Sequence, residues 1–359
     1  MSGISSISGQ SFGPMTQIIE NATATAQKLD QLTEQASSGL VSQNYAGLGA
    51  GAAQIVLSVS PQIAAANAQV SAINAVTGPM TTQQNALTEI SSIVTGVVSQ
   101  LSSLNTLDAS SASTVIGSAR QALEQVASLL DTQDGDDYVF GGQDSGEAPV
   151  PDANDIAGSG FFSQIQSAVS NLSTNGAGAT FSSLLGIGGS TASGTTPFAA
   201  GLEASSGLPS VTLANGEQVT TGIAANANGF VTSSGAGASS TGSYMRDILA
   251  GLAGIASLAP AQLGDSGFSG FVTSVQASLT NANDTLNEDA GVLGNLQTGL
   301  SDKSTGLQST VTALTNQVSN ADTVDTASTL SQLSSVQTAL ESSYQLIAGM
   351  KDMTLAHYL

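Results

Sequence analysis

The chain has no cysteine and no tryptophan, and only 4% of its 359 residues are aromatic. Without cysteine it can form no disulfide, no thiolate metal site and no cysteine nucleophile. The shortage of aromatic side chains argues against a deep ligand pocket, since such pockets are usually lined by them. We therefore expect helix packing or assembly to stabilise the protein.

Positive charge is also scarce, because 5 Lys and Arg residues stand against 26 Asp and Glu, which gives a formal net charge of -21. Nucleic-acid phosphates and anionic lipids are bound by clustered basic residues. The basic residues of this chain are scattered at Lys28, Arg120, Arg246, Lys303 and Lys351. We expect no nucleic-acid partner and no membrane partner.

Long apolar runs are missing as well. No run approaches the roughly 18 apolar residues that a membrane-spanning helix needs. The first residues, MSGISSI, lack the basic and apolar regions of a Sec signal peptide. If the protein leaves the cell, we expect it to use a route without a cleaved signal.

Residues suited to catalysis or metal binding are few. His357 is the only histidine, so a Ser-His-Asp triad would have to use this position near the chain end. A zinc site needs several His, Cys or carboxylate ligands, and the glycine-rich segments show no phosphate-binding pattern. We predict no catalytic residue, no cofactor and no metal ligand, and hence a protein that is not an enzyme.

One acidic run leaves an alternative open. It contains no base and comprises Asp131, Asp134, Asp136, Asp137, Asp144, Glu147, Asp152 and Asp155. Ca²⁺ is bound by such carboxylates, but Gly135 falls at the wrong place for an EF-hand loop and no bidentate Glu follows. A solvated acidic turn is the preferred interpretation, and cation binding is the alternative.

Heptad periodicity is the strongest pattern present. In the first half, apolar residues lie seven apart at Val59, Ala66, Ile73, Met80, Leu87, Val94 and Leu101, and a second row is broken by Gln83. In the second half they recur at Val272, Leu279, Leu286, Leu293, Leu300, Leu307 and Leu314. Such rows are typical of long coiled-coil helices. The predicted rod core consists of Ile73, Leu87, Val94, Leu101, Leu279, Leu286, Leu293, Leu300, Leu307 and Leu314.

Shorter stripes mark both extremities. Near the start, Ile18, Ala22, Thr25, Leu29, Leu32 and Ala36 alternate at spacings of four and three, and Gly39 is expected to end this helix. Near the end, Leu330, Leu333, Leu340, Tyr344 and Ile347 share a face. We expect these ends to order when a neighbour covers them. The predicted assembly interface is Ile18, Leu29, Leu32, Leu330, Leu333, Leu340, Tyr344 and Ile347.

The segment between these helices differs in composition. Gly, Ser, Thr and Pro dominate residues 143–245, and the pair Asn215-Gly216 joins two short strand candidates. We predict a mainly α fold, in which long N- and C-terminal helices pack as a coiled-coil-like bundle around an inserted, partly β middle domain. The expected segments are 1–40 and 320–359 for assembly, 41–142 and 246–319 for the rod, and 143–245 for the insertion.

An ordinary intramolecular bundle would explain the same periodicity. Assembly is favoured by the glycines inside the C-terminal row, Gly291, Gly294, Gly299 and Gly306. Each glycine costs on the order of 1 kcal/mol of helix stability, so contacts outside the helix are expected to compensate.

Four sequence motifs resemble a known family: LDQLTEQASSGLVSQNYAGLG at 29–49, ALEQVASLLDTQDGDDYVFGG at 122–142, VTTGIAANANGF at 219–230, and the last thirty residues, with ALESSY at 339–344 the clearest part. Together they resemble the bacterial flagellin superfamily and, within it, the hook-filament junction proteins known as hook-associated protein 3. The ending LAHYL favours the junction proteins. The segment Tyr45 to Gly49 departs from the acidic stretch of many relatives, so polar contacts of those acids are not carried over.

The resemblance implies a structural subunit of the bacterial flagellum that is exported unfolded through the flagellar type III channel and is located outside the cell. It also implies contacts with other copies of itself, an adjacent hook-associated protein, flagellin and a cytoplasmic export chaperone. It further implies that a β-hairpin begins at Tyr138 to Gly142. Filament flagellin is the first alternative, and a secreted adhesin or needle-tip-like protein is a more distant one.

Overall fold

A computed structural model describes residues 13–104, 108–205, 207–212, 216 and 218–352 of the chain. They form two compact units. The first contains the described residues up to Asn67 and from Ser309 onward, and the second runs from Ala68 to Gln308. Helices dominate both units, so the predicted mainly α class is confirmed. His357 lies outside the described residues.

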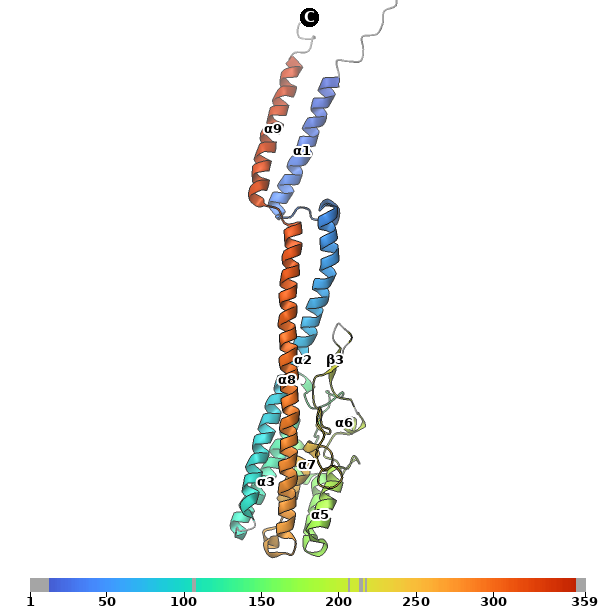
Figure 1. Ribbon diagram of the computed structural model, residues 1–359, viewed down its shortest axis with the longest axis vertical. Coiled ribbons are helices and arrows are strands. Elements are labelled where there is room, and N and C mark those ends of the chain that lie inside the picture. Colours follow the sequence, from blue (N-terminus) through green and yellow to red (C-terminus); the bar gives the residue numbers. More distant parts are fainter. Residues whose placement is uncertain (1–12, 105–107, 206, 213–215, 217, 353–359) are drawn as a thin grey trace, which may run out of the picture. The chain divides into compact units, whose positions relative to one another are not determined.

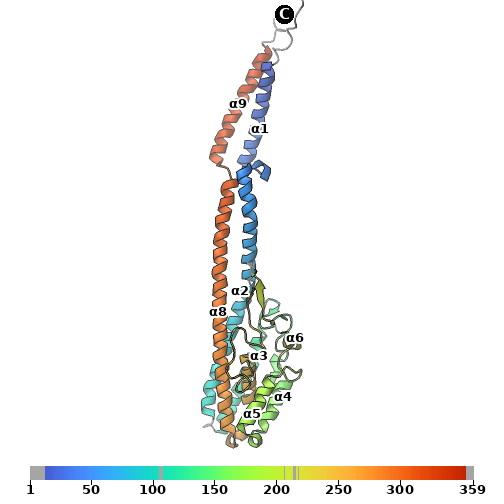
Figure 2. The ribbon, with the colours of Figure 1, turned by 45° about the vertical axis from the view of Figure 1, so that its right-hand side comes forward.

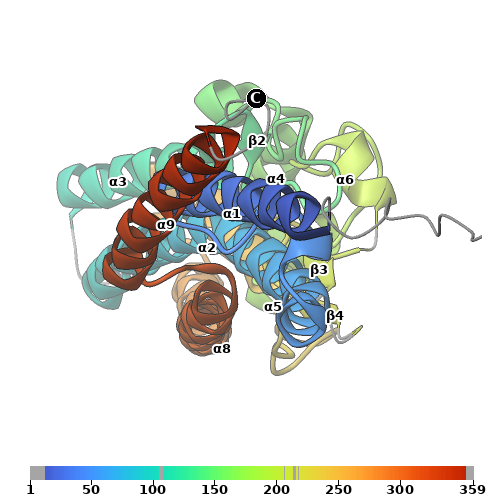
Figure 3. The same cartoon turned by 90° about the horizontal axis from the view of Figure 1, so that it is seen from above.

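The first unit is built around helices from the two ends of the chain. Helix α1 (Gly13–Ser38) and helix α9 (Thr326–Asp352) lie side by side in both views of Figures 1 and 3. Gly39 ends α1 with a φ of +72°, a left-handed conformation that glycine adopts without steric cost. A 3₁₀ turn, η1 (Tyr45–Gly47), follows.

Two long helices contribute to both units. Helix α2 (Ala50–Leu104) and helix α8 (Phe268–Asp322) contain 55 residues each. Helix α2 continues through Pro61 and through Gly78-Pro79. Proline has no backbone N–H, so Pro79 leaves the carbonyl of Ala75 without its usual helical donor.

The core of the second unit surrounds helix α7 (Tyr244–Ala256), every residue of which is buried. Helices α3 (Ala109–Leu130), α4 (Gly160–Ser170) and α5 (Leu172–Gly188) pack against it, and Figure 2 shows α4 and α5 side by side. The remaining helical pieces are η2 (Ala153–Gly158), the short α6 (Ala200–Ala204) and η3 (Pro260–Gly264).

Strands are short and form two antiparallel pairs. Strand β1 (Gln133–Asp134) pairs with β2 (Asp137–Tyr138), and β3 (Ser210–Thr212) pairs with β4 (Gln218–Thr220). The first hairpin therefore ends at Tyr138, whereas the resemblance placed its beginning there. The second pair lies where strand candidates were expected.

The boundaries between the two compact units differ from the boundaries of the expected segments. The boundaries fall inside α2 and α8, after Asn67 and after Gln308. Residues 143–245 share one apolar core with the second unit's part of α2 and α8, so they form no separate compact unit. Helices α4 and α5 form within this segment because their apolar faces bury Phe161, Ile165, Phe181 and Leu184.

Candidate functional site

The two terminal helices meet along a regular seam. The covered rows are Ile18, Ala22, Thr25, Leu29, Leu32 and Ala36 on α1, beside which Ala26 and Gln35 are also partly covered, and Thr329, Leu333, Val336, Leu340, Ser343 and Ile347 on α9. Both rows alternate at spacings of four and three, as in a coiled coil. Leu32 and Leu340 are the most covered large side chains, with 2% and 9% of their surface exposed. We call these two rows the α1–α9 seam.

A short backbone pairing fixes the register of this seam. The N–H of Val41 donates to the carbonyl of Asp322 at 2.7 Å, and the N–H of Val324 donates to the carbonyl of Gly39 at 3.0 Å. The side chain of Gln35 donates to the carbonyl of Val41 at 2.8 Å. The chain leaving α1 is thereby tied to the chain entering α9.

The seam divides the predicted assembly residues into two groups. Ile18, Leu29, Leu32, Leu333, Leu340 and Ile347 lie on it, so the two ends of one chain already cover each other. The packing of the terminal helices against each other agrees with the predicted bundle, and contact of these residues with a neighbour stays a prediction. Leu330 and Tyr344 lie off the seam and are 56% and 55% exposed.

Two further exposed apolar residues escaped the sequence interpretation. Ile19 on α1 is 48% exposed and Leu346 on α9 is 62% exposed. Each stands next to a position of the apolar row, and an isolated apolar residue beside such a row gives no periodic signal. We call Ile19, Leu330, Tyr344 and Leu346 the outer apolar residues.

The predicted rod core is placed as follows. Eight of these residues are almost completely buried: Ile73, Leu87, Val94, Leu101, Leu279, Leu286, Leu293 and Leu300. Leu307 is half-buried against the same core. Leu314 belongs to the first unit and is also half-buried.

Polar pairs run beside the leucine row at multiples of seven residues. Side-chain hydrogen bonds join Gln276 to Ser102 at 2.8 Å, Asn283 to Thr95 at 3.2 Å, Gln297 to Thr81 at 2.5 Å and Ser304 to Asn74 at 3.4 Å. The residue numbers of these pairs rise along α8 and fall along α2, so the two helices are antiparallel. Polar contacts in such a seam specify register at some cost in stability.

Gln83 and Asp289 bind backbone of the inserted segment. The Nε2 atom of Gln83 donates to the carbonyls of Val139 at 2.8 Å and Ile223 at 2.7 Å, and its Oε1 accepts from the Ile223 N–H at 2.9 Å. Gln83 is 1% exposed. Gln83, which breaks the second apolar row of α2, therefore holds two parts of the chain together. One is the segment near residue 139 that leads into the inserted segment, and the other is the segment near residue 223 that returns toward α7.

Asp289 on α8 holds the next part of the returning chain. Its carboxylate accepts from the N–H groups of Gly229, Phe230 and Val231 at 2.7, 2.6 and 3.1 Å. The Tyr244 hydroxyl donates to the same carboxylate at 2.8 Å. Burial, together with the charge of Asp289, raises the pKa of Tyr244 well above its ordinary value. Asp289 breaks the second apolar row of α8 between Ala282 and Leu296 and follows directly after Glu288. The sequence interpretation did not single it out.

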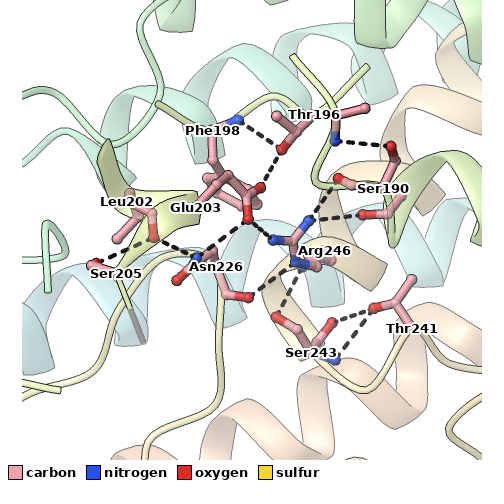
Figure 4. A network of polar contacts seen from close by, with 12 residues as sticks. Ser190, Thr196, Phe198, Leu202, Glu203, Ser205, Asn226, Thr241, Ser243 and Arg246 are labelled. Atoms are coloured by element: carbon pink, nitrogen blue, oxygen red, sulfur yellow. Dashed lines mark hydrogen bonds and ion pairs between the residues drawn. The ribbon is translucent and has the colours of Figure 1, made fainter. Parts of the chain in front are cut away.

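A buried ion pair fastens α6 to α7 (Figure 4). A guanidinium nitrogen of Arg246 lies 2.5 Å from a carboxylate oxygen of Glu203, and the guanidinium also donates to the carbonyls of Gly188, Ser190 and Asn226. Its plane stacks on the Phe198 ring, 5.0 Å from the centroid. With its donors satisfied on all sides, Arg246 has a structural role.

The acidic run begins with a perturbed carboxyl group. Asp131 accepts from the Val150 N–H at 2.8 Å, and burial raises its pKa to about 6. Asp134 and Asp137 face each other across the β1–β2 pair. Within the described part of the chain, no three His, Cys, Asp or Glu side chains converge as metal ligands would.

A cleft of the second unit with a volume of about 400 Å³ lies beside this hairpin. Its wall combines α2, the β1–β2 hairpin and the segments around Leu208 and Thr221. Among the described helices, none combines the length and apolar character needed to cross a membrane.

Comparison with known proteins adds no name to these features. No family model matches the sequence, and no curated protein gives a significant match.

Proposed function

We propose that this chain is a structural subunit of the bacterial flagellum that forms the junction between hook and filament by self-assembly of its terminal helices. The observation that carries the proposal is the α1–α9 pair. The two ends of the chain cover each other along the seam and still expose the outer apolar residues Ile19, Leu330, Tyr344 and Leu346.

Large exposed apolar side chains on one helix pair are suited to contact further copies. Burying one Leu or Ile contributes roughly 1.5–3 kcal/mol. Association costs about 4–15 kcal/mol in lost translational and rotational freedom. Four such residues, each already partly covered, contribute at most about 12 kcal/mol. Contacts with several neighbours would therefore make the assembly stable.

The sequence motifs add the biological setting. Under this proposal the protein lies outside the cell and contacts other copies of itself, an adjacent hook-associated protein and flagellin. Before export it would be bound by a flagellar chaperone. The acidic composition keeps isolated subunits soluble, an effect that salt screens.

The test is to locate tagged protein on isolated flagella by electron microscopy and to measure swimming after deletion of the gene. The proposal expects label at the hook end of each filament and loss of swimming. Label along the whole filament, with long filaments grown from purified protein alone, would identify a flagellin instead. Normal swimming without the gene would overturn both and leave an adhesin or needle-tip role.

A variant pair tests the outer apolar residues directly. Leu330→Asp combined with Tyr344→Asp is expected to abolish incorporation into flagella while the α1–α9 pair stays folded. Ser331→Asp combined with Thr338→Asp is the matched control, because both residues are exposed on α9 and lie outside the row that contains Leu330 and Tyr344. Normal incorporation of the double variant would contradict the proposed contact.

A further inference from the structure

The cleft of about 400 Å³ in the second unit has a size suited to one or two side chains of a ligand. Half-buried apolar residues form two of its walls: Val76 and Pro79 on α2, and Leu208 and Pro209 opposite. Its other wall carries Asp134, Asp137 and Tyr138 of the β1–β2 hairpin. Neither the α1–α9 seam nor the flagellar proposal uses this cleft.

Hydrogen-bond acceptors accumulate in the cleft. Pro79 has no N–H to give to the carbonyl of Ala75, and both residues line the cleft. The carboxylates of Asp134 and Asp137 add charged acceptors. Because the two acids are directly opposite in the antiparallel register, their like charges repel each other.

Cationic donors are missing from the same place. None of the described residues that line the cleft is Lys, Arg or His. In the described part of the chain, the recorded ion pair is that of Arg246 with Glu203, away from this hairpin. An ammonium or guanidinium group that enters the cleft would therefore meet the negative charge of two carboxylates and several hydrogen-bond acceptors. No cationic side chain among the described lining residues neutralises that charge.

The charge of the chain argues against a second copy as the occupant. Each copy carries a formal net charge of -21 and only 5 Lys and Arg residues. Approach of another copy to an acidic hairpin is therefore opposed by long-range repulsion. A partner of opposite charge character would be attracted.

We propose that this cleft binds an extended segment of another protein that carries an Arg or Lys next to an apolar residue. The cationic group lies between Asp134 and Asp137 and donates to their carboxylates and to the carbonyl of Ala75. The apolar neighbour packs between Pro79 and Leu208.

The experiment measures binding of the full chain to acetyl-Ala-Arg-Leu-Ala-amide by calorimetry and by NMR line shifts at low salt. The matched probe has citrulline in place of Arg, which keeps the shape and removes the charge. Saturable binding of the Arg peptide, at least about tenfold tighter than the citrulline peptide, is expected. Affinity is expected to fall when salt is raised.

Variants locate the site. Asp134→Asn and Asp137→Asn are each expected to weaken binding about threefold to tenfold. Asp136→Asn is the control, because Asp136 belongs to the same turn, is exposed and does not line the cleft. The Asn variants relieve the facing like charges, so their melting temperatures are expected to equal or exceed that of the parent.

Four results would overturn the proposal. They are no saturable binding of the Arg peptide, equal binding of the citrulline peptide, an equal effect of Asp136→Asn, and equal affinity for arginine amide alone. The third would indicate diffuse attraction to the acidic run, and the fourth a free small cation instead of a protein segment.

Discussion

Gln83 of α2 and Asp289 of α8 hold consecutive parts of the same returning chain. Gln83 accepts from the Ile223 N–H at 2.9 Å, and Asp289 accepts from the Phe230 N–H at 2.6 Å. Each residue interrupts the second apolar row of its helix, at positions where Ile90 and Ala282 continue the rows. The two interruptions attach the inserted segment to both long helices.

Gln83→Leu would complete the apolar row but leave three buried backbone groups without partners. Each such group costs roughly 1–3 kcal/mol, so we expect a loss of unfolding free energy of about 3 kcal/mol or more. Urea denaturation followed by circular dichroism measures it. Gln84→Leu is the control, since the Gln84 side-chain oxygen is buried without a partner. That variant is expected to be neutral or stabilising, and equal losses in the two would contradict the role of Gln83.

Asp289→Asn tests the neighbouring contact. The amide cannot accept from all the groups that Asp289 binds, and its NH₂ meets N–H donors, so a loss of about 2–4 kcal/mol is expected. The Tyr244 pKa should fall toward its ordinary value but stay raised, because burial is its largest cause and remains. Ultraviolet titration compared with a Tyr244→Phe variant separates this tyrosine from the others. An unchanged Tyr244 titration would show that the carboxylate does not act on it.

Asp131 predicts a pH dependence of stability. Its pKa is raised from 3.8 to about 6 in the folded chain, so the folded state binds the proton more tightly than the unfolded state. This contribution is complete below about pH 4 and is lost as the pH rises to about 6. Asp131→Asn keeps an acceptor for the Val150 N–H and should remove the slope. The variant is expected to be more stable than the parent at pH 7 and similar at pH 3.5, measured by urea unfolding.

Leu293→Asp tests the leucine row. Leu293 has no exposed surface, so a buried, unpaired carboxylate replaces a core side chain and we expect a loss of about 4 kcal/mol or more. Val292→Asp is the matched control one position away, at 36% exposure. Thermal melts should separate the two clearly. Similar melting temperatures would mean that the row is not the core of the second unit.

Leu340→Asp tests the α1–α9 seam within a single chain. Loss of this contact should separate the terminal helices, which are marginally stable when isolated. We expect lower helical circular dichroism and rapid proteolysis in 13–38 and 326–352, while the second unit melts as before. Leu330→Asp should leave both measurements unchanged, because Leu330 lies off the seam and is 56% exposed. Equal sensitivity of the two variants to protease would contradict this division.

The long helices were predictable from the periodicity of apolar residues. A strict spacing of seven identified the buried leucines of α8 because only one face of a helix repeats at that interval. Periodicity does not say what covers a stripe, so it could not distinguish cover by the other end of the chain, which the structure shows for Leu32 and Leu340, from cover by a neighbour. Gln83 was visible as a break in a row, but its partners at 139 and 223 are distant in sequence.

Composition indicated that the middle segment differs from the long helices, but it did not predict the extent of α4 and α5. Helix α5 contains Gly176, Gly178 and Gly186, residues that disfavour helix, and its backbone leaves the helical conformation at Gly176, where φ is +78°. Beyond this kink, tertiary packing overrides the preference, because Leu184 lies against Gly254 of α7, where an added Cβ would stand 2.9 Å from it. Small residues here allow close helix approach, which composition alone does not distinguish from loops and strands.

The α1–α9 seam also sets an order of events during synthesis. Leu32 leaves the ribosome long before its partner helix α9 exists, and at roughly 5–20 residues per second the delay is on the order of 15–60 s. Over that time α1 stays without its partner helix, and the second unit is complete once Gln308 has been made, shortly before α9. Helix α1, which is synthesised first, and helix α9, which is synthesised last, therefore pack together in the final step of folding and complete the first unit.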